Sequence, residues 1–286
     1  MRKFQIPEVI TNVILNLVQE HEEYKIFSYI QSIPLDVCRF IGMNEYLEVN
    51  CTKFEIALND VMRLNDKFDC CAVLPKCISG IKYVFDNKGL DVQLKKCNYH
   101  GRIEDIFENL QNENKKKFAL ASFTDKSNLY NCKMWYYYAS NYKGACLVYD
   151  LQILVKVLLM EMLKDYSTRL IILPVKYTNK LKENCGTLHS ELEILMWKYE
   201  WWKDEKEWRI VSTAGKVILH CKPKKIMLGP DIDVEKAEKI EKMCKDKRVQ
   251  VVRTHFSYSE LRIMEKEDLL EPATSARTKK TGHKRK

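Results

Sequence analysis

The stretch KMWYYYASNYKGACLVYD (133–150) decides the fold class predicted for this chain. Its first part, 133–142, is rich in aromatic residues and reads as a helix, and 144–150 follows as an apolar run typical of a buried strand. On either side, 118–124 reads as another buried strand and 151–164 as another helix. Helices and strands mix without regular alternation, which favours an α+β fold over a doubly wound α/β fold.

The rest of the chain extends this pattern. Strands are predicted over 37–42, 170–178, 207–213, 224–229 and 247–256, and helices near 103–117 and over 189–202 and 233–246. No internal repeat appears. We therefore expect a mixed, mainly antiparallel sheet flanked by helices.

Three parts are expected along the chain. Residues 1–33 carry apolar side chains at helical spacing and predict an N-terminal amphipathic helix. Residues 34–270 are predicted to form the main α+β domain. Residues 271–286 contain no large apolar side chain and predict a disordered basic tail.

Composition narrows the class of protein. Only 9 glycines occur among 286 residues and no glycine-rich phosphate-binding motif is present, which argues against a nucleotide cradle of that kind. The 11 cysteines are odd in number and form no CxxC pair, and no signal peptide precedes them. We expect reduced thiols, no metal site and a cytoplasmic protein. The longest apolar run, 151–163, is interrupted by polar residues, so no membrane span is expected.

The net charge of +9 is unevenly distributed. Residues 271–286 contain six Lys/Arg and one acid, which is +5, so the other 270 residues carry +4. A body with so small an excess of positive charge does not by itself indicate a nucleic-acid-binding protein.

Two polar motifs lie in the first part of the main domain. Arg39 stands between Cys38 and Phe40 in a predicted strand, and its guanidinium is suited to a phosphate or carboxylate; the alternative is a surface arginine on an edge strand. In RLNDKFDC (63–70), Asn65, Asp66 and Asp69 predict either a loop that contacts a ribose, base or metal, or a turn with ordinary capping residues.

Two further motifs lie in the second half. Ser122 and Thr124 share one face of a predicted strand, and Trp135 and Tyr138 follow as a stacking platform or, by the usual preference of aromatic residues, as helix core. In WWKDEKEWRI (201–210), Glu205 and Glu207 are two residues apart at the start of a strand, so both carboxylates are expected in one cleft, where tryptophans would raise a carboxyl pKa. The alternative is a solvated loop in which Arg209 pairs with a glutamate.

Together the motifs resemble a known family. CRFIG, RLNDKFDC, ASFT, MWYYYASNYKGACLVYD, VKYT and EKEWRIV occur in this order over about residues 36–255. They resemble a large bacterial family catalogued as a domain of unknown function, which occurs near mobile elements and phage-defence genes. Lys67 stands where that family often has proline, and Tyr137 where histidine is common.

A second resemblance is to arginine–serine–glutamate ADP-ribosyltransferases. It implies that Arg39 binds NAD, that Ser122 or Thr124 shapes the nicotinamide pocket, and that Glu207 stabilises the transition state while Glu205 orients the acceptor. NAD is then the substrate, with Asn65, Asp66, Trp135 and Tyr138 as further candidates to contact it. The acceptor would be an unidentified protein or nucleic acid, with an antitoxin or defence partner for a toxin or defence effector.

Two other function classes stay open. Asp66, Asp69, Glu205 and Glu207 are a candidate magnesium site of a nuclease or phosphodiesterase. A non-catalytic sensor or interaction module would instead use these residues as internal hydrogen-bond networks. One cleft that holds Arg39, Ser122 and Glu207 would favour the enzyme that consumes NAD.

Overall fold

The computed structural model describes residues 35–64, 118–164, 170–180, 195–213 and 215–266, with short pieces at 25, 28–30, 33, 66, 68–70, 73–74, 112, 115–116 and 182–183. Most of the helix predicted over 1–33, most of the helix predicted near 103–117, Asn65 and the tail 271–286 lie outside the described residues.

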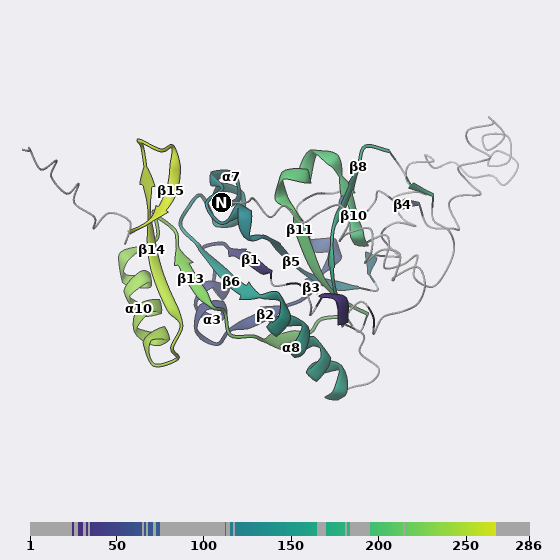
Figure 1. The fold of residues 1–286 in the computed structure, drawn as a ribbon, viewed down its shortest axis with the longest axis horizontal. Coiled ribbons are helices and arrows are strands. Elements are labelled where there is room, and N and C mark those ends of the chain that lie inside the picture. The colour runs from purple at the N-terminus through teal and green to yellow at the C-terminus, as the bar shows by residue number, and fades with distance from the viewer. Residues whose placement is uncertain are drawn as a thin grey trace, which may run out of the picture.

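Strands outnumber helices in the described part of the chain (Figure 1). The strands are β1 (Asp36–Ile41), β2 (Glu55–Ala57), β3 (Asn59–Asp60), β4 (Val73–Leu74), β5 (Ala119–Asp125), β6 (Ala145–Asp150), β7 (Leu170–Pro174), β8 (Lys176–Thr178), β9 (Lys182–Glu183), β10 (Trp197–Tyr199), β11 (Glu207–Ser212), β12 (Ile218–His220), β13 (Lys225–Leu228), β14 (Gln250–Ser257) and β15 (Arg262–Glu265). The helices are α3 (Tyr46–Thr52), α7 (Cys132–Tyr138), α8 (Leu151–Lys164) and α10 (Val234–Lys245), with 3-10 turns η1 (Val61–Arg63), η2 (Lys126–Asn128) and η3 (Glu200–Glu205).

One nine-stranded sheet organises the described part of the chain. Its order is β15-β14-β13-β6-β1-β5-β11-β7, and β3 adds a short pairing to β5. Neighbouring strands of this sheet are antiparallel except β13 and β14, which are parallel because α10 connects them as a crossover. The predicted α+β class with a mainly antiparallel sheet is confirmed.

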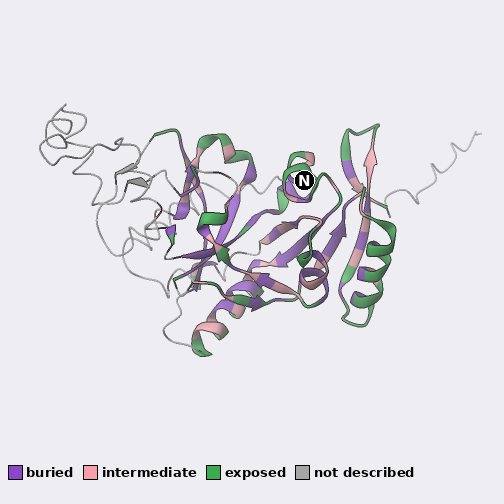
Figure 2. Cartoon of the chain, turned by 180° about the vertical axis from the view of Figure 1, so that it is seen from behind, coloured by how far each residue is buried: buried purple, intermediate pink, exposed green. Residues whose placement is uncertain are grey.

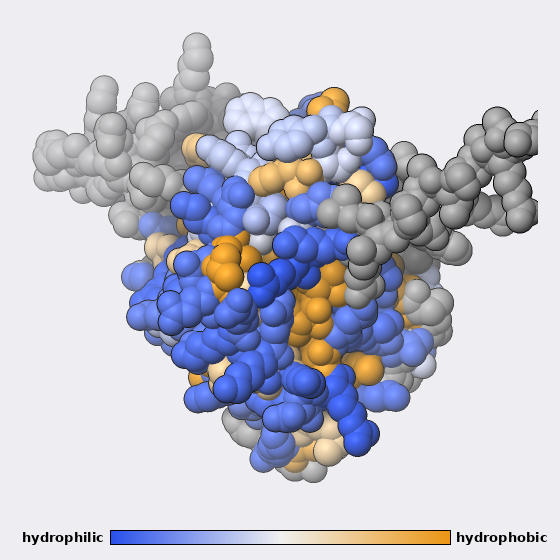
Figure 3. Space-filling view, turned by 90° about the vertical axis from the view of Figure 1, so that its left-hand side faces the viewer, coloured by the Kyte–Doolittle hydropathy of each residue, from blue (hydrophilic) through white to orange (hydrophobic). Residues whose placement is uncertain are grey.

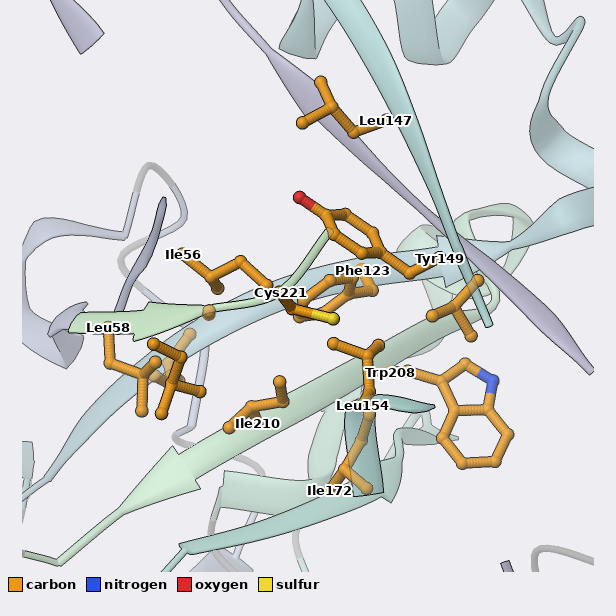
Figure 4. Packing of buried hydrophobic residues seen from close by; sticks show 14 of the residues in the cluster. Ile56, Leu58, Phe123, Leu147, Tyr149, Leu154, Ile172, Trp208, Ile210 and Cys221 are labelled. Carbon is orange, nitrogen blue, oxygen red and sulfur yellow. The ribbon is translucent and has the colours of Figure 1, made fainter. Parts of the chain in front are cut away.

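Helices cover both faces of the sheet. On one face, Trp135 of α7 packs with Cys38, Cys146 and Val148. On the other face, α3, α8 and α10 enclose the larger core, where Leu154 of α8 lies with Trp208 and other side chains from β2, β5 and β11 (Figure 4). Figure 2 shows the strands largely buried and the outward side of α10 exposed. Among the described residues, no helix is long and apolar enough to cross a membrane.

Three predicted boundaries were wrong. The helix predicted over 133–142 ends at Tyr138, because Ser140, Asn141 and Tyr142 take left-handed φ angles of 48°, 53° and 67° that end a right-handed helix. Within the helix predicted over 189–202, Trp197–Tyr199 is a strand parallel to β8. The strand predicted over 170–178 divides at Val175 into β7 and β8, after Pro174, which has no backbone N–H for a ladder.

The feature that places the functional site is the divergence of β1 from β5. These strands share only two residue pairs, Val37–Asp125 and Cys38–Thr124, whereas β1 pairs with β6 over six residues and β5 with β11 over six. Beyond Cys38 the two strands separate, and β3 occupies the other end of β5. The sheet is therefore split next to its centre.

Candidate functional site

A cleft of about 790 Å³ lies where β1 and β5 separate. Its closed end is marked by the last β1–β5 pair, Cys38–Thr124, and its walls come from β1, β5, α3, α7 and the turn before β11. The predicted site residues that line it are Arg39, Asp69, Ser122, Thr124, Tyr138, Glu205 and Glu207. The volume is within the range of clefts that bind small molecules, roughly 300–1,000 Å³.

A buried charged network forms the floor beside Thr124. Glu207 begins β11 opposite Thr124, and Arg209 follows two residues later, opposite Ser122. Because side chains alternate along a strand, Glu207 and Arg209 point to the same face, while Trp208 between them packs in the core. Arg209 Nε lies 2.8 Å from Glu207 Oε1, and its Nη2 lies 3.0 Å from Glu207 Oε2.

Lys198 of β10 joins three carboxylates. Its Nζ is 2.7 Å from Glu205 Oε2, 3.2 Å from Glu207 Oε2 and 3.4 Å from Asp69 Oδ2. Asp69 also accepts two hydrogen bonds from Arg209 Nη2, at 2.7 and 2.8 Å. All five side chains are buried. Two cations thus face three carboxylates, which leaves one negative charge in excess when every group is ionised.

The backbone that carries Glu205 and Glu207 is tied to β5. Thr124 donates its hydroxyl to the Glu205 carbonyl, and Asn128 Nδ2 donates to the same carbonyl at 2.9 Å. Lys206 adopts a left-handed φ of 45°, and its carbonyl accepts from Asp125 N at 3.1 Å. This tight turn between η3 and β11 brings both carboxylates to the same cleft, as the sequence predicted.

Burial and neighbouring charges separate the two glutamates in pKa. For Glu205, burial raises the pKa and the Glu207 charge adds to the shift, although Lys198 and the hydroxyl of Tyr138 oppose it. For Glu207, burial also opposes ionisation, but Arg209 and Lys198 outweigh it, so its pKa is lowered. Arg209 and Lys198 thus favour the ionised form of Glu207, whereas burial favours the protonated form of Glu205.

The raised pKa of Glu205 predicts how stability varies with pH. Because the pKa of Glu205 is higher in the folded than in the unfolded protein, its protonated form stabilises the fold. This contribution is fully present below the ordinary glutamate pKa, about 4.3, and is lost as pH rises through the higher folded-state value. We expect Glu205→Gln, which mimics the protonated acid, to gain in unfolding free energy relative to wild type between about pH 4 and pH 8. Urea denaturation at several pH values measures this difference. Parallel pH profiles for the two proteins would show that ionisation at position 205 is not linked to folding.

Arg39 enters the cleft from the opposite face of the sheet. Cys38, Thr124 and Glu207 are register partners on one face, so Arg39 points to the other. Its Nη2 donates to the Ala57 carbonyl at 3.3 Å, and its guanidinium lies 5.5 Å from the centre of the Phe123 ring. Among the described residues, buried Nη1 has no hydrogen-bond partner. Burial lowers the pKa of this guanidinium, with a smaller opposing effect from Tyr149.

Three of the predicted contact residues lie on the expected strand and helix and line the cleft: Ser122 and Thr124 on β5, and Tyr138 on α7. Ser122 is exposed to the cleft, and its hydroxyl contributes a hydrogen bond that favours the ionised form of Glu207. Phe123 between the two hydroxyl residues packs in the core. Tyr138 donates its hydroxyl to Glu205 Oε1.

Two predicted contact residues, Trp135 and Asp66, are not brought to the cleft. Trp135 is fully buried, donates Nε1 to the Leu129 carbonyl at 2.8 Å and does not line the cleft, which agrees with the helix-core alternative. Asp66 caps the following turn, where its Oδ1 accepts from Phe68 N at 2.9 Å. Asn65 lies outside the described residues.

The sequence analysis did not single out Lys198. It lies in a run of aromatic residues read as a helix, and only the strand alternation of β10, in which Trp197 and Tyr199 are partly exposed, turns it inward. Arg209 was interpreted as a partner for a glutamate in a solvated loop or, in a nuclease, as a contact to a phosphate. That pair exists, but both residues are buried, so the solvated loop was wrong.

Metal binding has little support in this geometry. The described residues contain no group of three or more His, Cys, Asp or Glu side chains arranged to hold an ion. Asp69, Glu205 and Glu207 instead direct oxygens at Lys198 Nζ. A divalent cation at this point would have to displace the lysine ammonium group.

Comparison with known proteins gives a match over the central part of the chain. No curated protein and no solved structure matches it. The matched region runs from α7 through β11, and so contains Tyr138, Lys198, Glu205, Glu207 and Arg209. Residues 134–210 match the family described as protein of unknown function (DUF2971), which confirms the resemblance to a family of unknown function.

Proposed function

We propose that this protein is an NAD-consuming ADP-ribosyltransferase that modifies a macromolecular acceptor. The observation that carries the proposal is the cleft itself, to which β1, β5 and β11 contribute Arg39, Ser122 and Glu207. These three residues come from distant parts of the chain, and Arg39 reaches the cleft from the face opposite to Ser122 and Glu207, so their shared cleft was not built into any one motif.

Each residue has a role that its surroundings support. A phosphate oxygen of NAD would satisfy the unpaired Nη1 of Arg39 with a charge-assisted hydrogen bond. Glu207 is ionised and is held in place by Arg209 and Lys198, so its charge is already oriented when the reaction begins. A fixed anion of this kind stabilises a sugar on which positive charge develops.

The proposed reaction is a displacement at C1′ of the nicotinamide ribose. The bond from C1′ to the nicotinamide nitrogen breaks, and its electron pair leaves with nicotinamide. A nucleophilic oxygen or nitrogen of the acceptor forms the new bond to C1′, and its proton passes to Glu205. The raised pKa of Glu205 makes its carboxylate a stronger base than an exposed glutamate.

The metal-dependent nuclease is less well supported. That mechanism needs carboxylate oxygens that are free to bind magnesium. Here the carboxylates of Asp69, Glu205 and Glu207 are all paired with Lys198. Those of Asp69 and Glu207 are also paired with Arg209.

Nicotinamide release tests the proposal, with Arg39→Lys as the informative variant. Purified protein is incubated with NAD, with and without cell lysate as a source of acceptor. Lysine keeps the positive charge but loses the forked donors, so we expect KM for NAD to rise about 10- to 100-fold with little change in kcat.

The matched control is Arg253→Lys, since Arg253 pairs with Glu241 of α10 and does not line the cleft. Its KM is expected to equal that of wild type. Failure to release nicotinamide under either condition, or an unchanged KM in Arg39→Lys, would count against the proposal.

The resemblance to a family found near phage-defence genes extends the proposal to a toxin or defence effector. Expression of the wild-type chain is then expected to slow growth and deplete NAD, and Glu207→Gln is expected to relieve both effects. Equal growth inhibition by the two proteins at equal expression would contradict this role.

A further inference from the structure

One residue pair is missing from the sheet between β1 and β5. The ladder between these strands ends at the pair Cys38–Thr124. Phe40 of β1 and Ser122 of β5 lie two residues further along and would form the next pair of the same kind, but they are not paired. Beyond Ser122, β3 takes over the pairing with β5 at Leu120. Phe40 and Ser122 both line the cleft and face a gap that is closed at each end by paired residues.

The hydrogen bonds of the neighbouring strands show where the main chain of these two residues points. Successive residues of an antiparallel strand direct their N–H and C=O groups to opposite sides. The carbonyl of Leu35, just before β1, accepts from the residue after β6 at 3.0 Å, so Phe40, five residues later, points towards β5. Asp125 N donates at 3.1 Å to the residue before β11, so Ser122, three residues earlier, points towards β1. The main-chain groups of both residues therefore point into the gap.

This gap offers two N–H donors and two C=O acceptors, one of each from Phe40 and from Ser122. Among the described strands, neither residue has a partner on this side. The paired residues of β5 on either side of Ser122 are four positions apart, which is about 13 Å of strand. Space of this length, closed at both ends, suits one small group and leaves no room for a peptide chain to continue along the strands.

The charges of the cleft favour an uncharged occupant of the gap. Five carboxylates line the cleft against four cations. They are Glu55, Asp60, Asp69, Glu205 and Glu207 against Arg39, Arg63, Lys198 and Lys216. An anion in the gap would accept from the N–H groups but would face the two carbonyl oxygens, and an ammonium group would face the two N–H groups. The site at Arg39 differs, because its guanidinium points to the other face of the sheet.

We infer that the gap between Phe40 and Ser122 binds a primary carboxamide. The carboxamide oxygen accepts from a main-chain N–H, and the carboxamide NH₂ donates to a main-chain carbonyl, as the missing residue pair would do. This group occurs on an aromatic ring in the nicotinamide of NAD, and on the Asn or Gln side chain of a protein acceptor. The first source rests on the proposed function, whereas binding of a carboxamide does not.

Binding of small probes to the isotope-labelled full chain, followed by NMR of its main-chain amides, tests the inference without NAD. Benzamide is compared with acetophenone, in which a methyl group replaces the NH₂. We expect benzamide to bind at least about 10-fold more tightly and to move the amide signals of Phe40 and Ser122. Benzoate, which has no donor, should also bind more weakly. Signals of α10, which does not line the cleft and whose outer surface is mostly hydrophilic (Figure 3), are the reference and should not move.

Removal of a single donor gives the matched variant. Replacement of Ser122 by its α-hydroxy acid analogue changes the main-chain N–H to an ester oxygen and keeps the side chain. We expect the affinity for benzamide to fall about 3- to 10-fold. The same replacement at Ser127 is the control, because that N–H donates to Asp125 Oδ1 at 2.8 Å and Ser127 does not line the cleft. Its affinity should equal that of wild type.

The outcomes separate this inference from the proposed function. Equal affinity for benzamide and acetophenone, or signal changes confined to other residues, overturns the inference even if nicotinamide is released from NAD. A preference for benzamide that survives loss of the Ser122 N–H also overturns it. A preference that is lost in this variant supports the inference even if NAD is not consumed.

A second pair of probes, propionamide and butanone, identifies the source of the carboxamide. A preference for propionamide as large as that for benzamide supports a site that also accepts an Asn or Gln side chain. A preference confined to the aromatic pair supports a site for a carboxamide on a ring.

Discussion

Arg209→Met is expected to lower the free energy of unfolding by about 3–5 kcal/mol, the usual cost of removing one partner from a buried ion pair. The substitution leaves Asp69, Glu205 and Glu207 with Lys198 as the remaining cation of the network described above. It also removes the hydrogen bond of 2.8 Å that Arg209 Nη1 donates to the Leu195 carbonyl. Urea denaturation followed by circular dichroism measures the change.

The matched substitution is Arg253→Met. Arg253 also makes two hydrogen bonds to one carboxylate, that of Glu241, but this pair is partly exposed. We expect a loss of about 1 kcal/mol or less there. A similar small loss for Arg209→Met would mean that the buried network contributes little to stability.

The effect of Arg209→Met should also depend on pH in a defined direction. The lowered pKa of Glu207 contributes stability that is present above the ordinary glutamate value and is lost as pH falls through the folded-state value. Without Arg209 that contribution shrinks. The difference between wild type and variant is therefore expected to be largest at neutral pH and to decrease as pH falls from about 4.5 towards about 2.

Glu207→Gln is expected to reduce kcat for nicotinamide release by about 10²–10³-fold with little change in KM. Glutamine has nearly the same shape, but it lacks the negative charge that the proposed mechanism places beside the developing positive charge on the ribose. Only transition-state stabilisation is lost, so the effect appears in kcat. Steady-state kinetics with varied NAD measures both constants.

Asp69→Asn is the control for indirect damage. It removes a buried carboxylate that faces the same two cations, at 2.7 Å from Arg209 and 3.4 Å from Lys198, so its loss of stability should be similar. In the proposed mechanism Asp69 does not contact the ribose, and kcat should fall much less. If both variants lost activity equally, the defect would come from the disturbed network, and Glu207 would lose its assigned role.

Local sequence determined most of the elements. The helix expected over 151–164 coincides with α8, and the strand expected over 207–213 differs from β11 by one residue. Alternation along β5 also placed Ser122 and Thr124 on one face, because neighbours in a strand point to opposite sides whatever the sheet around them. Residue spacing of this kind depends only on backbone geometry.

Other features depended on contacts between distant segments. Trp135 was a candidate to stack on a ligand, yet the packing of α7 on β1 and β6 turned it inward and left Tyr136 and Tyr137 outside. Within the helix predicted over 189–202, residues 197–199 form the strand β10, because pairing with β8 supplies their backbone hydrogen bonds. Helical and extended patterns are hard to distinguish in a short run rich in apolar residues.

The sequence by itself determined the α+β class, the main strands and helices, and the paired glutamates at the start of β11. Only the tertiary structure decided that Arg39 and Glu207 share a cleft, that Lys198 joins Asp69 to both glutamates, and which glutamate has the raised pKa. The reason is physical: side-chain alternation acts over a few residues, whereas burial and Coulomb interactions depend on strand register and on segments that meet only when the chain folds.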